Sequence, residues 1–408
     1  MPVRTSSWPT GWPSFTPQDD DLNDTYQQNL KKEIISEYGE AALKQAWVRA
    51  CKELVSVTSS IAKQGSSAVP IFEFGDVIGP QNWKILAQMK TMRCFIIRGV
   101  IPQAKADKLF EELQGFVHKN SGITGWPSAS PAVFHLYSSP IQLKLRTHPN
   151  QLKIQRLLNG LFTDSNCSPE ELEAQCEPIL YPDALRIRQP GQEFLGLGPH
   201  IDAGGLSRWA DHPYRRAYDK IFSGHPEDWD PYDLTHRRDA APDLFPSGVH
   251  CSALRTFQGW TALTPCGPGE GGLMILPDVK TVTAYMMLRP FFKCLQDKDW
   301  KDPENWTVDD SAWFPGTKRW DSQMLSPGSH PHLRLEETLV GAPHVEPGDT
   351  IWWHGDVSLI KFLLSMFSNR ANIIALNLVL MLMLIISLFH PLNPTFIVFK
   401  DPTDTKVH

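Results

Sequence analysis

Two short segments carry the residue types of a metal site. His200-Ile201-Asp202 and His354-Gly355-Asp356 each have a histidine two residues before an aspartate. On a β-strand, residues i and i+2 face the same side, so each segment would aim an imidazole and a carboxylate at one point. With a third, distant histidine, such a pair makes the facial triad that binds Fe(II) and leaves positions open for a cosubstrate and dioxygen. A chain with 14 histidines contains roughly one such segment by chance, so surface or capping residues are the competing interpretation.

The segments around the first pair indicate a series of short strands. Leu185 to Arg188 alternates apolar and basic residues, which puts Arg186 and Arg188 on one face of a strand. Further strands are predicted over 194–202, 250–263, 272–277 and 349–354, separated by turn clusters rich in glycine and proline. Since paired strands follow His200 and Asp202, the first pair is the better candidate.

Helices are predicted ahead of this strand-rich part. Apolar residues recur at helical spacing through a long helix over 23–66, after a disordered arm over 1–22. A buried strand is expected over 94–100, and helices are expected over 102–120 and 151–162. Two long polar stretches, 207–247 and 298–331, are predicted to be insertions into a domain that covers 67–357.

Composition narrows the function classes. Of the 408 residues, 41% are hydrophobic and 21% are charged, which excludes wholesale disorder. The net charge of -6 argues against a nucleic-acid-binding protein. Seven cysteines without a C-x-x-C pair support neither a disulfide framework nor a zinc knuckle, so a reducing, cytoplasmic compartment is expected.

The C-terminal part departs in character from the rest of the chain. Residues 358–408 are predicted to be an aberrant apolar tail, and within it the 19 residues of 371–389 carry no charge. A helix of this length spans roughly 28 Å, about one bilayer core. The tail is therefore interpreted either as a membrane anchor or as a translated intron, because Val357-Ser358 can be encoded by a sequence that resembles a splice donor.

The order of the motifs resembles that of the Fe(II)- and 2-oxoglutarate-dependent oxygenases, in the neighbourhood of phytanoyl-CoA dioxygenase. In that group an H-x-D strand is followed by a W-x-A-L strand, a G-x-L-x-x-x-P strand and a G-D-x-x-x-x-H segment. The corresponding segments here are His200 to Asp202, Trp260 to Leu263, Gly272 to Pro277 and Gly348 to His354. More narrowly, from about Lys31 to Val357 the chain is similar to the family labelled domain of unknown function 1479.

This resemblance implies a fold and a chemistry. The implied fold is α+β, a double-stranded β-helix (jelly roll, cupin-like) with an N-terminal helical cover, to which the apolar tail would add a C-terminal helix. The implied reaction is hydroxylation of a small organic substrate with Fe(II) and 2-oxoglutarate. His200 and Asp202 would hold the metal, and Arg186, Arg188 and Arg255 are candidates for binding the cosubstrate.

The resemblance fails at one position. In these oxygenases the strand ending at His354 continues for five residues to a distal metal-binding histidine, and Leu359 stands there in this chain. The final strand, with its basic residue for 2-oxoglutarate, is replaced by the tail, and His354 is the remaining candidate for the third ligand. Activity is therefore expected to be impaired, and the alternatives are a non-catalytic or mis-spliced relative and a membrane-anchored binding protein.

Overall fold

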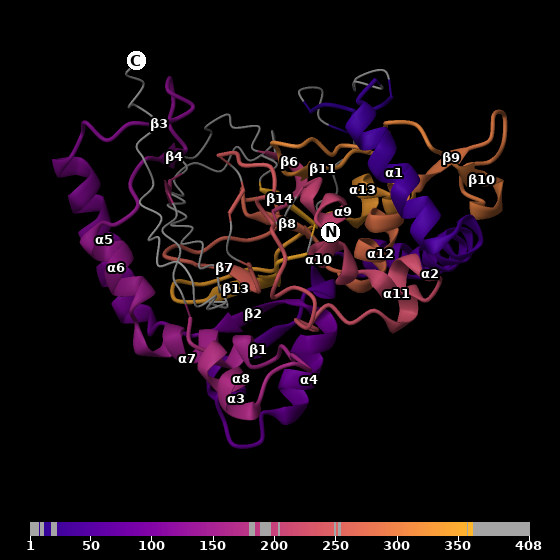
Figure 1. The fold of residues 1–408 in the computed structure, drawn as a ribbon. Helices are drawn as coiled ribbons and strands as arrows, with labels where there is room; N and C mark the ends of the chain where they lie inside the picture. The colour runs from indigo at the N-terminus through magenta and orange to yellow at the C-terminus, as the bar shows by residue number, and fades with distance from the viewer. Residues whose placement is uncertain are drawn as a thin grey trace, which may run out of the picture.

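The computed structural model describes residues 8, 12–17, 23–178, 184–187, 197–202, 205–248, 250–251, 254–356 and 358–361. It combines helices with several small β-sheets, so the predicted mixed α+β class is confirmed (Figure 1). The predicted membrane helix at 371–389 and the cosubstrate candidate Arg188 lie outside the described residues. Among the helices in the described ranges, none combines the length and the apolar character needed to cross a bilayer.

Two helices, rather than the single predicted helix over 23–66, begin the described fold. They are α1 (Thr25–Tyr38) and α2 (Glu40–Gln64). The Asp24 side chain caps α1 by accepting a hydrogen bond from the backbone N–H of Gln27. Gly39 separates the helices because its φ of 83° is incompatible with a continuous helix, and a residue without a Cβ adopts that angle readily. Apolar periodicity continues across this glycine, which is why the sequence indicated one helix.

A four-stranded sheet forms one layer of the fold. Its strands, in spatial order, are β1 (Ile71–Glu73), β2 (Cys94–Arg98), β13 (Thr350–His354) and β7 (Phe257–Thr261). Only β1 and β2 pair in parallel; β13 is antiparallel to both of its neighbours. The strand predicted over 250–263 is shorter than expected, because the ring nitrogens of His250 contact the carbonyl oxygens of Phe245 and Asp321 and hold this part in a loop.

A five-stranded antiparallel sheet carries the first candidate pair. Its spatial order is β11 (Gln323–Met324), β6 (Leu197–Ile201), β14 (Ser358–Lys361), β8 (Leu273–Leu276) and β12 (Val340–Gly341). β14 pairs with both β6 and β8. The predicted domain boundary at 357 is therefore too early, because the hydrogen-bonded sheet continues to Lys361.

Smaller sheets and further helices surround these two layers. One small sheet contains β3 (Gly125–Trp126), β4 (Val133–Phe134) and β5 (Leu185–Arg186), and another pairs β9 (Phe292–Cys294) with β10 (Trp306–Val308). The predicted helices over 102–120 and 151–162 correspond to α5 (Gln103–Lys119) and α7 (Pro149–Asn159). The other α-helices are α3 (Phe74–Val77), α4 (Trp83–Met92), α6 (Pro140–Arg146), α8 (Pro169–Gln175), α9 (Ser207–Ala210), α10 (His212–Arg216), α11 (Asp219–Phe222), α12 (Lys280–Leu288) and α13 (Leu335–Thr338). Short 3-10 helices cover Gly65–Ala68, Pro226–Asp228, Arg289–Phe291, Pro303–Asn305 and Pro331–Leu333.

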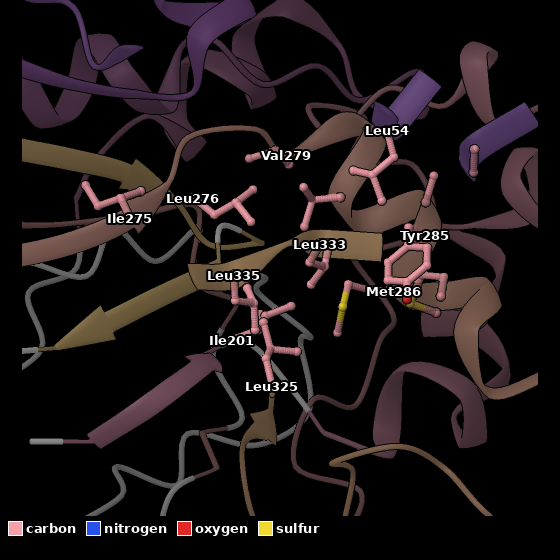
Figure 2. Packing of buried hydrophobic residues seen from close by; sticks show 14 of the residues in the cluster. Leu54, Ile201, Ile275, Leu276, Val279, Tyr285, Met286, Leu325, Leu333 and Leu335 are labelled. Atoms are coloured by element: carbon pink, nitrogen blue, oxygen red, sulfur yellow. The ribbon is translucent and has the colours of Figure 1, made fainter. Parts of the chain in front are cut away.

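The main apolar core packs around the five-stranded sheet and includes residues from both of its faces, such as the neighbours Ile275 and Leu276 of β8 (Figure 2). Ile201 of β6 and Leu276 of β8 belong to the same buried cluster as Leu54 of α2 and Tyr285 of α12 (Figure 2). Both strand residues are in register with Ser358, so they share a face of the sheet. Because alternate residues of a strand face opposite sides, His200 lies on the other face from Ile201, and this is the face of Ile275, since both are in register with Leu359.

One buried charge joins the N-terminal helix to the second insertion. The Lys31 side chain is fully buried, and its Nζ donates to the carbonyl oxygen of Trp313 at 2.8 Å and lies 3.5 Å from Asp309 Oδ2. Burial lowers the pKa of this amine to about 8, and Asp309 opposes that shift. Strand β10 and Asp309 both lie in 298–331, so part of that insertion is packed against α1.

Candidate functional site

The first candidate pair forms a close contact at the end of β6. His200 Nε2 lies 2.9 Å from Asp202 Oδ1, and the His200 side chain is buried. The other ring nitrogen, Nδ1, lies 2.7 Å from the carbonyl oxygen of Gly198. Since a carbonyl oxygen only accepts, Nδ1 carries the hydrogen and donates it, which fixes the tautomer of the imidazole.

This tautomer makes the pair suited to a cation. With its hydrogen on Nδ1, a neutral His200 has a lone pair on Nε2, and that lone pair points to a carboxylate oxygen that also only accepts. Two acceptors at 2.9 Å repel each other unless a proton or a metal ion lies with them. A histidine oriented by a backbone carbonyl, next to a carboxylate, is the usual arrangement of protein metal ligands. The donor set therefore fits a divalent cation.

A leucine occupies the position where the family resemblance implies a third ligand. In the antiparallel pairing of β14 with β6, residue 359 is directly opposite His200, so the two positions share a face of the sheet. Residue 359 is a leucine, which has no lone pair to offer. No group of three His, Cys, Asp or Glu side chains in the described ranges is arranged to hold a metal ion. Among the described residues, His200 and Asp202 are the two candidate ligands that the structure brings into contact.

His354 lies in the other sheet, and its ring is fully engaged there. Its Nε2 donates to the carbonyl oxygen of Pro231 at 3.1 Å, and its Nδ1 accepts from the backbone N–H of Asp356 at 3.1 Å. The ring stacks on Phe162, with 5.4 Å between the ring centroids. Burial lowers the pKa of His354 to about 3, so the ring is neutral near pH 7. The structure does not bring His354 to the His200–Asp202 pair.

Asp356 is instead held by two buried arginines. Its Oδ1 accepts from Arg208 Nη2 at 2.9 Å, and its Oδ2 accepts from Arg237 Nη2 at 2.7 Å. All three side chains are buried. Burial alone would raise the pKa of the Asp356 carboxyl, but Arg237 and Arg208 hold it well below its usual range. We refer to Arg208, Asp356 and Arg237 as the buried ion cluster.

The two described arginines that were predicted to bind the cosubstrate lie in different parts of the fold. Arg255 Nη1 donates to the carbonyl oxygen of Asp202 at 2.7 Å, so this guanidinium lies beside the candidate metal pair. Arg186 lies in β5, where its backbone pairs with Val133 in the three-stranded sheet. Arg255 is therefore in direct contact with the pair.

The buried ion cluster was not predicted from the sequence. Arg208 and Arg237 are 148 and 119 residues from Asp356, so no local spacing relates them. Both lie in the first insertion, which the sequence indicated only as a long polar stretch. The available signal was the clustering of arginines there, since long insertions with many charges often carry functional residues.

Comparisons with known proteins identify relatives of this chain. The Gig2-like family model matches residues 20–360. An Escherichia coli K12 relative, "Uncharacterized protein YbiU", is 30% identical over 315 residues, which cover 74% of this chain and 70% of that protein. Among solved structures, Candida albicans GlcNAc Inducible Gene 2, GIG2 (DUF1479), has a TM-score of 0.75 and 28% identity, covering 89% of this chain and 76% of the other. A Salmonella typhimurium LT2 protein described as "Putative Oxidoreductase" has a TM-score of 0.68 and 25% identity, covering 88% and 82%.

These matches confirm the resemblance to the family labelled domain of unknown function 1479. The family model covers most of the described residues, including β6 with the candidate pair and nearly all of β14. The chain belongs to the Gig2-like family.

Proposed function

We propose that this chain has the scaffold of an Fe(II)- and 2-oxoglutarate-dependent oxygenase acting on a small organic substrate, with its turnover reduced by the leucine at position 359. The observation that carries the proposal is the contact between His200 Nε2 and Asp202 Oδ1, two acceptors at 2.9 Å. The carbonyl of Gly198 fixes the tautomer that makes this contact favourable only with a bound cation or proton.

The connectivity of the two larger sheets supports a double-stranded β-helix. Along the chain, β6 lies in the five-stranded sheet, β7 in the four-stranded sheet, β8 and β12 in the five-stranded, β13 in the four-stranded and β14 in the five-stranded. This alternation, with the spatial order β6-β14-β8-β12 in one sheet, supports the proposal because strands of a jelly roll alternate between two sheets. In the described part of the chain, β7 is the last strand of its sheet, where the final strand of the jelly roll would pair.

Each residue of the pair would have a separate task. His200 and Asp202 would hold Fe(II), and the metal would supply the activation of dioxygen together with 2-oxoglutarate. Gly198 keeps the imidazole oriented through its carbonyl. Arg255, which already contacts the backbone of Asp202, would attract a carboxylate of the cosubstrate. The Salmonella relative described as an oxidoreductase supports this reaction class.

A second function, metal binding without turnover, is favoured by one observation. The position opposite His200 is a leucine. A metal ion with two protein ligands has more coordination positions filled by water than one with three. A non-catalytic relative of this kind, including one with a mis-spliced tail, would keep the metal site and lose the reaction. A membrane-anchored binding protein is the other alternative, whereas the seven cysteines without a C-x-x-C pair favour the cytoplasmic location that we propose.

Cobalt titration and succinate release test the proposal together. The full chain, freed of metal, should bind one Co(II) per chain, detected by its visible absorption. Asp202→Asn should bind it much more weakly, whereas His354→Gln, the matched change in the second motif, should bind it as the wild type does. Succinate release from 2-oxoglutarate should be slow. Equal Co(II) binding by wild type and Asp202→Asn would contradict the metal assignment.

A further inference from the structure

The guanidinium group of Arg208 has unused donors in a fully buried position. Arg208 is 0% exposed, and of its three nitrogens only Nη2 has a partner, the carboxylate of Asp356. Nε and Nη1 are buried without a hydrogen-bond partner in the described part of the chain. A buried charged group whose donors have no acceptor destabilises the fold. Such donors therefore usually bind an acceptor that is not part of the protein, such as a water molecule or an ion.

The buried ion cluster also has a surplus of positive charge. Arg208 and Arg237 share the single carboxylate of Asp356, and Nε of Arg237 is another buried donor that has no partner among the described residues. The neighbouring titratable groups are neutral: burial lowers the pKa of His354 to about 3, and burial raises the pKa of the Tyr218 phenol well above its usual range. Two cations therefore face one anion in a region closed to water.

Asp356 of the cluster lies in the segment that joins the two larger sheets. Asp356 comes two residues before Ser358, which is in register with Ile201 on β6. On the other side, the backbone N–H of Gly355 donates to the carbonyl oxygen of Thr256, next to Arg255. The carboxylate of the cluster thus lies between the end of β13 and the start of β14.

We infer that the buried ion cluster binds one small monovalent anion, whose acceptor atoms contact Nε and Nη1 of Arg208. A water molecule could accept these hydrogen bonds, but it would leave the surplus positive charge unbalanced. A monovalent anion both accepts the hydrogen bonds and balances the charge. Two sources have this chemistry: an inorganic anion such as a halide, and the carboxylate of a small organic acid. The inference does not depend on the proposed function, because it requires no metal.

The test uses the full chain without added metal. The midpoint of thermal unfolding is measured at constant ionic strength while sodium gluconate, whose anion is too large for a closed site, is replaced by sodium bromide or sodium acetate. The wild type should show a saturable rise of about 2–4 °C with the fitting anion. A response to bromide indicates an inorganic anion, and a response to acetate alone indicates a carboxylate.

Two variants and one direct measurement make the test decisive. Arg208→Gln leaves Arg237 and Asp356 as a neutral pair and should abolish the response. Arg215→Gln on the neighbouring helix is the matched control and should keep it, because Arg215 already donates to Trp209 and Glu33. If Arg208→Gln does not fold, anomalous scattering from wild-type crystals with bromide and a matched acetate crystal should show the anion at Arg208 Nη1. Identical unfolding midpoints in all three salts, with a water at Nη1, would overturn the inference.

Discussion

The two H-x-D segments of this chain have the same pattern and opposite surroundings. In the first, the carboxylate of Asp202 faces the imidazole of His200, and both are acceptors at the point of contact. In the second, the carboxylate of Asp356 accepts hydrogen bonds from two arginines, and each ring nitrogen of His354 has a hydrogen-bond partner in the backbone. The pattern sets the spacing of the two side chains. Their partners, which come from far along the chain, decide whether a lone pair is left for a metal.

The largest expected difference between the segments is in how much each aspartate contributes to the free energy of unfolding. Asp356→Asn would leave two buried guanidinium groups without a carboxylate, which should lower the free energy of unfolding by about 3–5 kcal/mol. Asp202→Asn should change it by less than about 1 kcal/mol, because an asparagine amide donates to His200 Nε2 and removes the acceptor–acceptor contact. Urea unfolding of the full-length variants measures both. Similar losses for the two changes would mean that the segments do not differ as described.

The missing ligand offers the next test. Leu359→His puts an imidazole at the position in register with His200 and should raise the affinity for Co(II) at least about tenfold. Turnover of 2-oxoglutarate should stay low, because the change restores no basic final strand. The control is Ile360→His, one residue along β14, which should not raise the affinity because alternate residues face opposite sides. An equal gain from both variants would argue against the register-based assignment.

Acid should affect the second segment more than the first. The pKa of His354 is about 3 in the fold and 6.5 in an unfolded chain, so below pH 6.5 the unfolded chain binds a proton that the fold excludes. Stability should therefore fall as the pH falls from 6.5, by about 2 kcal/mol at pH 5. His332, with a pKa lowered to about 4 by burial and by Arg289, should add to the same loss.

The measurement is the slope of unfolding free energy against pH between 6.5 and 5. His354→Gln should make this slope smaller than in the wild type, whatever it does to the absolute stability. His344→Gln is the control, because His344 is exposed beside Glu346 and should leave the slope unchanged. A wild-type slope retained in full by His354→Gln would contradict the neutral, buried state of this ring.

The smallest expected effect concerns the arginines near the pair. Arg255→Met removes a guanidinium beside Asp202 and should weaken 2-oxoglutarate binding to the Co(II)-loaded chain about tenfold. Arg186→Met, in the three-stranded sheet, should leave that affinity unchanged. Calorimetric titration compares them. A greater effect of Arg186→Met would contradict the assignment of Arg255 as the residue that binds the cosubstrate.

The sequence predicted those parts whose information is local. Helix α5 and strands β2, β8 and β13 follow from periodicity and turn residues close to them. Gly39 was missed because the apolar spacing continues across it, although its φ of 83° ends one helix and begins another. Strand β14 was missed because residues after Val357 read as an apolar tail; only the pairing with β6 and β8 identifies four of them as part of the sheet.

The candidate site was predictable in part for the same reason. His200 and Asp202 are two residues apart, and the strand period alone brings them together. The hydrogen bond from Arg255 to Asp202 spans 53 residues, and the contacts of Arg208 and Arg237 with Asp356 span more than twice that distance. Contacts of this range depend on how the sheets and insertions pack, which no local pattern contains.

The buried amine of Lys31 has a consequence for how the chain folds during synthesis. Its hydrogen-bond partner, the carbonyl oxygen of Trp313, is 282 residues later in the sequence. The apolar face of α2 also packs against residues that are synthesised late, since Trp47 stacks on Tyr285 and Phe292. A nascent chain that has grown past both helices therefore exposes their apolar faces until most of the protein has been made. We expect such chains to depend on chaperones, and fragments ending before Tyr285 to aggregate rather than form stable intermediates.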